Sequence, residues 1–350
     1  MKKLIQDIFN TWNEDGDFCG VFSASSADGV IFQHAAGYRN MAEELPNTPD
    51  TAFAIASGTK LFTGLAICKL IDEGKLLLQD KLWDLIKQDL GQIDKRVTVH
   101  QLLTHTSGVG DYIDEESEDS EAMLDALYAK YPCYLWTQLD YYLQMIAPLP
   151  PKFEPGARYG YSNSGYVLLG LVVEAVSGMP YQQYVQENIM AKVGEHSSPL
   201  EHTGFYRMDS LPANTALGYI EDEDTEELRT NIFSMPILGG SDGGLYTCAA
   251  DLDKLWRAIF ANQILSESMT QTLLSQHVVI DEEDGESYGL GVYRYQDGDR
   301  LANFAVGGDS GVGFFTAYYP KTGVVVSGFS NMGWIDGTYA LIGKMLEILG

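Results

Sequence analysis

The sequence predicts an α+β fold in which one antiparallel sheet is built from both ends of the chain, is flanked by helices and carries a mostly helical inserted lobe. Strand-like runs occur at residues 18–24 and 30–36, and they return after residue 289. Between them, helical spacing of apolar residues dominates from about residue 80 to residue 235. Strands at both ends of the sequence with helices between them favour a single sheet with a helical insertion.

The length of 350 residues and the hydrophobic content of 45% are enough for a substantial core. They allow one domain with two lobes or two domains, and we predict a single domain over residues 1–350. Its α/β lobe is expected to comprise residues 1–79 and 236–350, and its mainly helical lobe residues 80–235. A cleft between the lobes is the expected site for a ligand.

The first predicted elements are an amphipathic helix and a β-hairpin. The turn pair Asp28-Gly29 separates the first two strand runs, which predicts the hairpin. Helical spacing then begins at Ser57, and Gly74 is a plausible end of that helix. Ser57 is therefore expected at or near the first turn of a buried helix. The apolar residues on one side of the first helix are Leu4, Ile5, Ile8, Phe9 and Trp12.

The remaining elements follow from the same two periodicities. Helical segments are predicted at residues 99–103, 121–131, 136–146 and 164–176. Strands are predicted at residues 289–295, 301–306, 313–319 and 324–330, followed by an amphipathic helix at residues 339–349.

The charge excludes two classes of partner. The net charge of −27, from 49 acidic against 22 basic residues, repels nucleic acid phosphates and anionic lipid. The N-terminal apolar run is interrupted by Gln6, Asp7 and Asn10, unlike a signal peptide, and no segment approaches a membrane span of about 20 apolar residues. We therefore expect no nucleic acid or membrane partner and a cytoplasmic protein, unless the chain is a trimmed form of a secreted one.

No metal or cofactor is expected. The cysteines are scattered, without a C-x-x-C pair or a nearby histidine, so we expect reduced thiols rather than a zinc site. Acidic runs at residues 111–121, 221–227 and 281–286 lack the ligand spacing of an EF-hand and are interpreted as solvated loops. The cysteines are Cys19, Cys68, Cys133 and Cys248.

Ser57-Gly58-Thr59-Lys60 is an S-x-x-K motif, whose two outer side chains share one face of a helix. A serine hydroxyl attacks an acyl carbon only if a base removes its proton, and an ordinary lysine is protonated at neutral pH. Burial and the positive end of the helix both disfavour the ammonium form, so this position supplies the lower pKa that a lysine base needs. The alternative is a helix cap followed by a surface lysine.

Further motifs occur in order along the chain: L-L-T-H-T-S-G at residues 102–108, F-E-P-G at 153–156, Y-S-N-S-G-Y at 161–166, G-G-L-Y-T at 243–247 and Y-G-L-G at 288–291. With them, the chain resembles the serine β-lactamase and penicillin-binding protein superfamily, in its class C β-lactamase-like, D-amino-acid peptidase and esterase branch. The resemblance covers about residues 18–330. It implies a β-lactamase/transpeptidase-like fold.

The resemblance also implies residue roles. Ser57 would be the nucleophile, Lys60 its general base and Tyr161 a phenol that relays protons to the leaving group. Asn163 would hydrogen-bond Lys60 and a substrate amide, and His105 would be structural. These roles imply a serine hydrolase that acts through an acyl-enzyme on a small-molecule or peptide ester or amide. The alternative is a non-hydrolytic penicillin-binding or sensor-like module that keeps the fold.

The third motif of this superfamily is altered. Relatives place Lys or His, followed by x-Gly, at the start of a strand that lines the cleft, and here Val306 stands in the basic position before Gly307 and Gly308. Valine cannot hold a carboxylate, so we expect weak or no β-lactamase activity and a preference for neutral esters or amides. The backbone N–H groups of Asp309 and Ser57 are expected to form the oxyanion hole, because a backbone donor does not depend on the side chain.

Two other motifs are interpreted as coincidental. Lys321-Thr322-Gly323 matches the usual form of the third motif, but it follows Pro320 between two strand runs and predicts a hairpin turn. His105, Asp251 and Ser310 occur in the order of a chymotrypsin-like triad, but that fold is all-β whereas the middle of this chain is helical.

Overall fold

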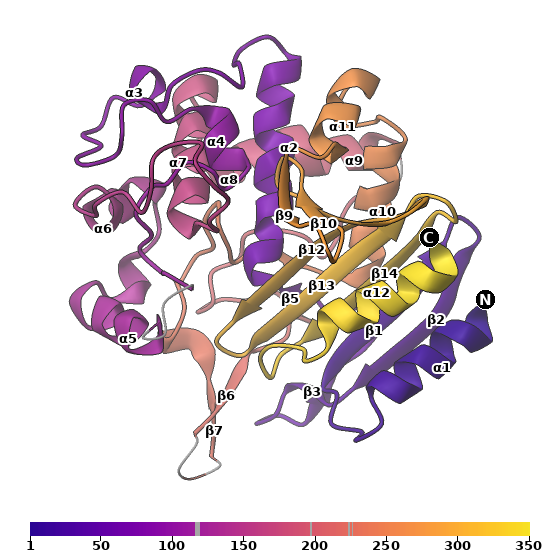
Figure 1. Ribbon diagram of the computed structural model, residues 1–350. Helices are drawn as coiled ribbons and strands as arrows, with labels where there is room; N and C mark the ends of the chain where they lie inside the picture. Colours follow the sequence, from indigo (N-terminus) through magenta and orange to yellow (C-terminus); the bar gives the residue numbers. More distant parts are fainter. Residues whose placement is uncertain (116–119, 197, 223–224, 226) are drawn as a thin grey trace.

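A computed structural model describes residues 1–115, 120–196, 198–222, 225 and 227–350. Within these residues the main sheet has eight antiparallel strands in the order β2-β1-β14-β13-β12-β11-β10-β9 (Figure 1). Because β1 pairs with β14, strands from both ends of the chain lie side by side, and the predicted α+β fold is confirmed. The strands are β1 (Gly20–Ser26), β2 (Gly29–Ala36), β9 (Val278–Asp281), β10 (Glu286–Tyr288), β11 (Tyr293–Asp297), β12 (Arg300–Asp309), β13 (Val312–Tyr319) and β14 (Val324–Ser330).

Helices cover both faces of this sheet. On one face, α1 (Lys2–Trp12) and α12 (Thr338–Leu349) pack against each other and against the strands (Figure 1). Ile5 and Phe9 of α1 are buried in that layer as predicted, whereas Leu4 is 54% exposed. On the other face lie α2 (Thr59–Asp72) and α10 (Ala249–Phe260), whose apolar residues belong to the larger core of the protein.

The middle of the chain is mainly helical, as predicted. Its helices include α3 (Leu82–Leu85), α4 (Val99–Leu103), α5 (Ser120–Lys130), α6 (Leu143–Ile146), α7 (Asn163–Ser177), α8 (Tyr181–Val185) and α9 (Ala191–His196). Helix α11 (Glu267–Leu274) follows α10. Short strand pairs outside the main sheet are β3 (Tyr38–Asn40) with β4 (Leu45–Pro46), β5 (Phe53–Ala54) with β8 (Tyr246–Thr247), and β6 (Tyr219–Glu221) with β7 (Leu228–Thr230).

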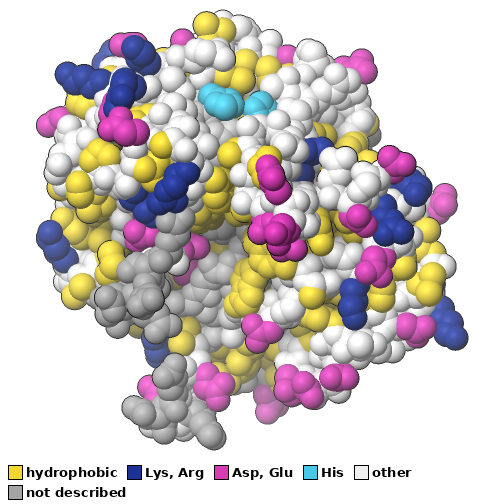
Figure 2. Space-filling view, in the orientation of Figure 1, with side chains coloured by type: hydrophobic (Ala, Val, Ile, Leu, Met, Phe, Trp, Pro, Cys, Tyr) yellow, Lys and Arg dark blue, Asp and Glu magenta, His cyan; other side chains and the backbone are white. Residues whose placement is uncertain are grey.

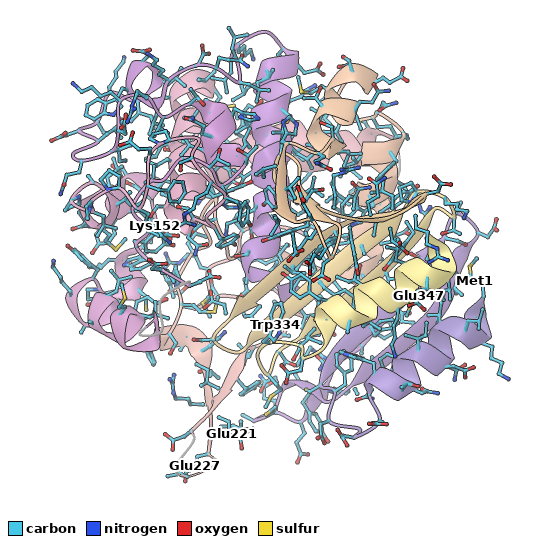
Figure 3. All side chains as sticks on the ribbon, in the orientation of Figure 1. Met1, Lys152, Glu221, Glu227, Trp334 and Glu347 are labelled. Atoms are coloured by element: carbon cyan, nitrogen blue, oxygen red, sulfur yellow. The ribbon has the colours of Figure 1, made fainter. Side chains whose placement is uncertain are left out.

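Three predicted elements differ from the structure. The helix expected at 136–146 is instead a 3-10 turn, Leu139–Tyr142, followed by the short α6. Of the strand expected at 289–295, only the part from Tyr293 on is a strand, as the start of β11. Residues 289–292, between β10 and β11, instead pack on α2, where a Cβ at Gly64 would lie 2.2 Å from the carbonyl oxygen of Leu290. The β6–β7 hairpin interrupts the expected helical region, and Glu221 and Glu227 lie on it where it projects from the body (Figure 3).

The surface is hollowed between the helices and the sheet, and hydrophobic side chains lie along the hollow (Figure 2). No helix among the described residues is long and apolar enough to cross a membrane. Parts of two acidic runs interpreted as solvated loops, residues 116–119 and 223, 224 and 226, lie outside the described residues.

Candidate active site

Ser57 lies on a 3-10 turn, Ala56–Gly58, that leads directly into α2. The preceding residue, Ala56, is 2% exposed and has a φ of 42°, in the left-handed region that residues with a side chain rarely adopt. Backbone strain of this kind persists only where the surrounding structure enforces it, and it is often found at functional sites. The predicted position of Ser57 at the start of a buried helix is confirmed.

Strand β12 holds this turn in place through Gly307. A Cβ at residue 307 would lie 2.2 Å from the carbonyl oxygen of Ile55 and 2.9 Å from the backbone nitrogen of Ser57. Only a residue without a side chain therefore allows β12 to approach the turn so closely.

This contact gives a test of how accurately the turn must be placed. We expect Gly307→Ala to lower kcat/KM by at least about 100-fold, because a shift of the turn misplaces Ser57. The free energy of unfolding should fall by about 1–3 kcal/mol from overpacking. Kinetics and urea unfolding of Gly307→Ala measure both effects. Gly194→Ala in α9, where the nearest atom is 3.4 Å away, is the control and should retain activity; equal activity in both variants would contradict the argument.

The Lys60 side chain is 2% exposed and its amine contacts three oxygen atoms. These are Ser57 Oγ at 2.9 Å, Asn163 Oδ1 at 2.7 Å and the backbone oxygen of Asp242 at 2.8 Å. A neutral amine has two N–H groups and one lone pair. Asn163 and Asp242 accept the two N–H groups, so the lone pair is left to accept the Ser57 hydroxyl proton.

The surroundings of Lys60 have opposing effects on the pKa of its amine. Burial lowers the pKa of Lys60 below its ordinary value, and nearby carboxylates, Asp242 and Glu115 foremost, partly offset this effect. Lys60 is also the second residue of α2, where the positive end of the helix dipole disfavours an ammonium.

Tyr161 completes the contacts of the serine. Its hydroxyl donates to Ser57 Oγ at 2.8 Å. Burial raises the pKa of Tyr161 well above its ordinary value, the Glu115 carboxylate adds to the rise, and the hydrogen bond to Ser57 opposes it. Tyr161 therefore holds its proton at neutral pH and can donate it to an atom near Ser57.

The start of α7 presents Asn163 to Lys60. Ser162 caps this helix by accepting the N–H of Gly165 at 3.0 Å. The buried Asp111 carboxylate accepts the N–H groups of Asn163 and Ser164, each at 2.8 Å. Asp111 thus fixes the helix turn from which the Asn163 side chain reaches the amine.

His105 is a structural residue, as the resemblance implied. It is 1% exposed, and its Nδ1 accepts the N–H of Ser162 at 3.1 Å. Since Nδ1 accepts, Nε2 carries the proton and donates to the Tyr288 hydroxyl at 3.3 Å. Burial lowers the pKa of His105 well below its ordinary value, so the ring stays neutral and packs against Tyr161.

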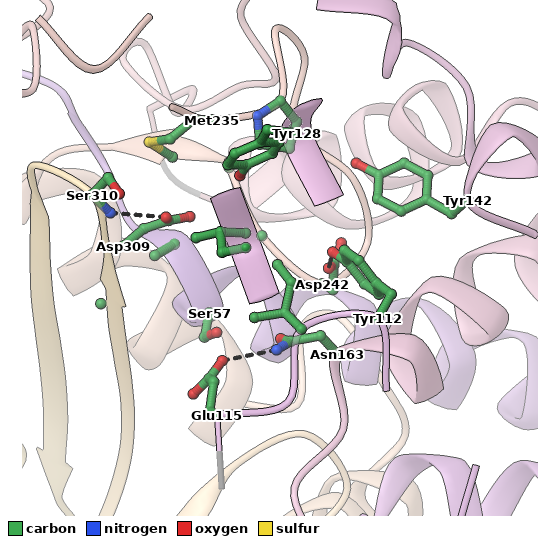
Figure 4. Close-up of a pocket in the computed structure, with 18 residues that line it drawn as sticks. Ser57, Tyr112, Glu115, Tyr128, Tyr142, Asn163, Met235, Asp242, Asp309 and Ser310 are labelled. Atoms are coloured by element: carbon green, nitrogen blue, oxygen red, sulfur yellow. Dashed lines mark hydrogen bonds between the residues drawn. The ribbon is translucent and has the colours of Figure 1, made fainter. Parts of the chain in front are cut away.

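Ser57 lines a cavity of about 230 Å³ (Figure 4). Three carboxylates, those of Glu115, Asp242 and Asp309, line it. The lining residues among those described include no Lys, Arg or His. The remaining lining residues are Ala56, Ser57, Tyr112, Ile113, Leu124, Tyr128, Tyr142, Asn163, Met235, Pro236, Gly239, Gly243, Gly244, Gly308 and Ser310.

The third motif is only partly where the sequence predicted it. Gly308 and Asp309 line the cavity, and Gly307 faces the Ser57 turn. Val306 is 8% exposed and lies in the apolar layer under α1 and α12, on the opposite face of the sheet. Its side chain therefore does not occupy the expected place in the cleft, because successive residues of a strand point to opposite faces. The oxyanion role of the Asp309 N–H stays a prediction.

Sequence reasoning missed the acidic residues of the cavity wall. Glu115 accepts from Asn163 Nδ2 at 2.8 Å, and Asp242 accepts the hydroxyl proton of the buried Tyr112 (Figure 4). Glu115 belongs to an acidic run interpreted as solvated, and Asp242 lies within a glycine-rich segment. The only available signal was the position of Asp242 directly before the G-G-L-Y-T motif.

The two coincidental motifs are not part of the site. Lys321 is exposed in the turn between β13 and β14, as predicted. Among the described residues, Asp251 accepts from Thr203 Oγ1 at 2.9 Å and pairs with Lys254 rather than with His105. A chymotrypsin-like triad is therefore not assembled from these residues.

Known proteins are similar to this chain in sequence and in fold. A sequence model of the family described as Beta-lactamase matches residues 5–333. The chain belongs to the beta-lactamase family. This confirms the resemblance drawn from the motifs. A penicillin-binding protein from Bacillus halodurans has a TM-score of 0.87 and 39% identity to this family member, over 97% of this chain and 99% of that one.

Other beta-lactamase relatives are more distant. Penicillin-binding protein 4* of Bacillus subtilis (strain 168) is 27% identical over 304 residues, which are 83% of this chain and 62% of that protein. The chain thus spans less than two thirds of that relative's length. A D-stereospecific amidohydrolase from Streptomyces sp. has a TM-score of 0.81 at 24% identity, covering 98% of this chain and 97% of that one, which is a likeness of fold alone.

Proposed function

We propose that this chain is a serine hydrolase that acts on an ester or amide through an acyl-enzyme at Ser57. The observation that carries the proposal is the pair of contacts to Ser57 Oγ, from the buried Lys60 amine at 2.9 Å and from the Tyr161 hydroxyl at 2.8 Å. One group can take a proton from the serine while the other gives a proton to a leaving group. The amidohydrolase likeness and the penicillin-binding relatives are compatible with this chemistry.

In acylation, Ser57 Oγ bonds to the carbonyl carbon as its proton passes to the Lys60 amine. The backbone N–H groups of Ser57 and Asp309 stabilise the charge that develops on the carbonyl oxygen. The bond to the leaving group then breaks, and that group takes the phenolic proton of Tyr161. Lys60 returns its proton to Tyr161, so both groups regain their starting protonation.

In deacylation, water takes the place of the leaving group. The neutral Lys60 amine accepts a proton from the water as the water oxygen bonds to the acyl carbon. The bond from that carbon to Ser57 Oγ then breaks, and the serine oxygen takes the proton back from Lys60, while Tyr161 keeps its own proton throughout. The products are a carboxylic acid and free enzyme, and no metal or redox partner is needed for the atoms to balance.

The charge of the cavity limits the substrate. Glu115 and Asp242 repel a substrate carboxylate, and the described lining offers no cationic side chain to bind one. Asp309 adds less repulsion at neutral pH, because burial raises the pKa of its carboxyl to about 7. β-Lactams and D-alanyl peptides carry such a carboxylate, so we infer that neutral or cationic esters and amides are preferred. This reason replaces the one drawn from Val306, whose side chain points elsewhere.

The proposal predicts the outcome of a substrate comparison. We expect kcat/KM for p-nitrophenyl acetate to exceed that for nitrocefin or a D-alanyl-D-alanine peptide by at least about tenfold, since one unfavourable charge contact costs about 1.4 kcal/mol or more. Steady-state kinetics on the purified protein measure this. Faster turnover of the carboxylate-bearing substrates would contradict the charge argument. A stable Ser57 adduct without turnover of any ester would favour the sensor-like module.

A further inference from the structure

One part of the cavity wall combines a buried carboxyl group with aromatic rings. Asp242 is 7% exposed, and its carboxyl accepts a hydrogen bond from Tyr112, which is also 7% exposed. Tyr112 packs edge-on against Tyr142, with ring centroids 5.5 Å apart, and Tyr128 is another aromatic residue of the lining. Carboxylates and aromatic faces together are the side chains that bind organic ammonium groups.

The size of the cavity restricts the ligand further. A volume of about 230 Å³ is at the small end of ligand cavities in proteins, which are typically about 300–1,000 Å³. It suits a compact acyl group better than a long chain or a bulky ring system. Glu115 is exposed and Asp242 is buried, and both line the cavity, so carboxyl groups stand on its solvent-exposed and on its buried wall (Figure 4).

We propose that this cavity selects substrates whose compact acyl group carries an ammonium, with Asp242 and the Tyr112 ring as its main contacts and Glu115 guiding its entry. The inference rests on the proposed hydrolysis at Ser57, because it concerns the acyl group that Ser57 receives. It assigns a substrate-binding role to Asp242 and Glu115, two residues that lie outside the S-x-x-K motif and the Y-S-N-S-G-Y motif.

A bound ammonium group would also change the pKa of Lys60, the proposed general base. The carboxylates Asp242 and Glu115 raise the pKa of Lys60, against the larger lowering by burial. An ammonium bound to these carboxylates cancels their effect, so it lowers the pKa of Lys60 further and favours the neutral amine. The titratable groups that act on Lys60 or contact it are Asp111, Glu115, Asp242, Asp309, His105, Tyr161 and Tyr166.

The test uses three p-nitroanilides with acyl groups of similar length. β-Alanyl carries an ammonium, butanoyl replaces it by a methyl group, and succinyl carries a carboxylate. We expect kcat/KM for β-alanyl to exceed that for butanoyl by at least about tenfold, which is about 1.4 kcal/mol. Succinyl should be the poorest substrate. In the pH dependence of kcat, the acidic limb for β-alanyl should lie at lower pH than that for butanoyl.

Substitutions of the cavity carboxylates test whether these residues cause the preference for the β-alanyl substrate. Asp242→Asn should reduce the β-alanyl to butanoyl ratio to within about threefold and bring the two acidic limbs together. Glu115→Gln keeps an oxygen for Asn163 and should reduce the same ratio, so it serves if Asp242→Asn fails to fold. Asp284→Asn, in the exposed turn before β10, removes the same charge far from the cavity and should leave the ratio unchanged.

The outcomes separate the two proposals. Equal or better hydrolysis of the butanoyl substrate, or a ratio unchanged in both cavity variants, overturns the ammonium inference and leaves the serine hydrolase intact. Absence of any turnover, together with absence of an acyl adduct on Ser57 by intact mass spectrometry, overturns the proposed function itself.

Discussion

Ser57→Ala should abolish turnover, with kcat/KM for a neutral ester reduced by at least about 10⁴-fold. The substitution removes the only oxygen that contacts both the Lys60 amine and the Tyr161 hydroxyl in the described structure. It leaves the cavity and the turn unchanged, so the protein should fold normally. Ester kinetics measure the loss, and intact mass spectrometry after a fluorophosphonate should show an adduct on the native protein and none on the variant.

Ser310→Ala is the matched control, because Ser310 lines the same cavity and belongs to the coincidental protease-like motif. We expect its kcat/KM to stay within about tenfold of the native value, since Ser310 is not hydrogen-bonded to Lys60 or Tyr161 in the described part of the chain. A fluorophosphonate adduct that persists in Ser57→Ala and disappears in Ser310→Ala would reverse the assignment of the nucleophile.

The fold was predictable wherever local pattern and tertiary packing agree. The Asp28-Gly29 turn between two alternating runs predicts β1 and β2, and the amphipathic pattern predicts α12. The segment 289–295 has equally good strand residues, but residues between β10 and β11 are held against Gly64 of α2. The local pattern of apolar and polar residues cannot predict that contact, because it joins residues more than 200 positions apart in the sequence.

The residues of the site likewise fall into those that the sequence predicts and those that only the structure reveals. The Ser57 and Lys60 contact follows from helical spacing, and the participation of Tyr161 and Asn163 required the family motifs. The side-chain direction of Val306 was not predictable, because it depends on the register in which β12 meets the Ser57 turn. The cavity carboxylates Glu115 and Asp242 are recognisable only in three dimensions, since each comes from a segment whose composition is typical of a loop.

Lys60→Arg should reduce kcat/KM by about 10³-fold or more, although it keeps the positive charge. The reason is the hydrogen-bond count at the amine. Neutral Lys60 has a lone pair for the Ser57 proton, whereas a guanidinium has no acceptor and does not lose its proton in proteins. Ester kinetics measure the loss, with Lys69→Arg on the same helix as the control. Lys69 pairs with Glu73, away from the cavity, and its variant should stay within about twofold of native activity.

The pH dependence tests the same argument without a mutation. Only the neutral form of Lys60 accepts the serine proton, so kcat/KM of the native enzyme should rise with pH as the amine loses its proton and then level off. Because burial lowers this pKa, the rise should lie below the ordinary lysine value of 10.5. Lys60→Arg should show no such rise. If instead its activity recovers at high pH, or if native activity falls as pH increases through neutrality, the base is a group other than the Lys60 amine.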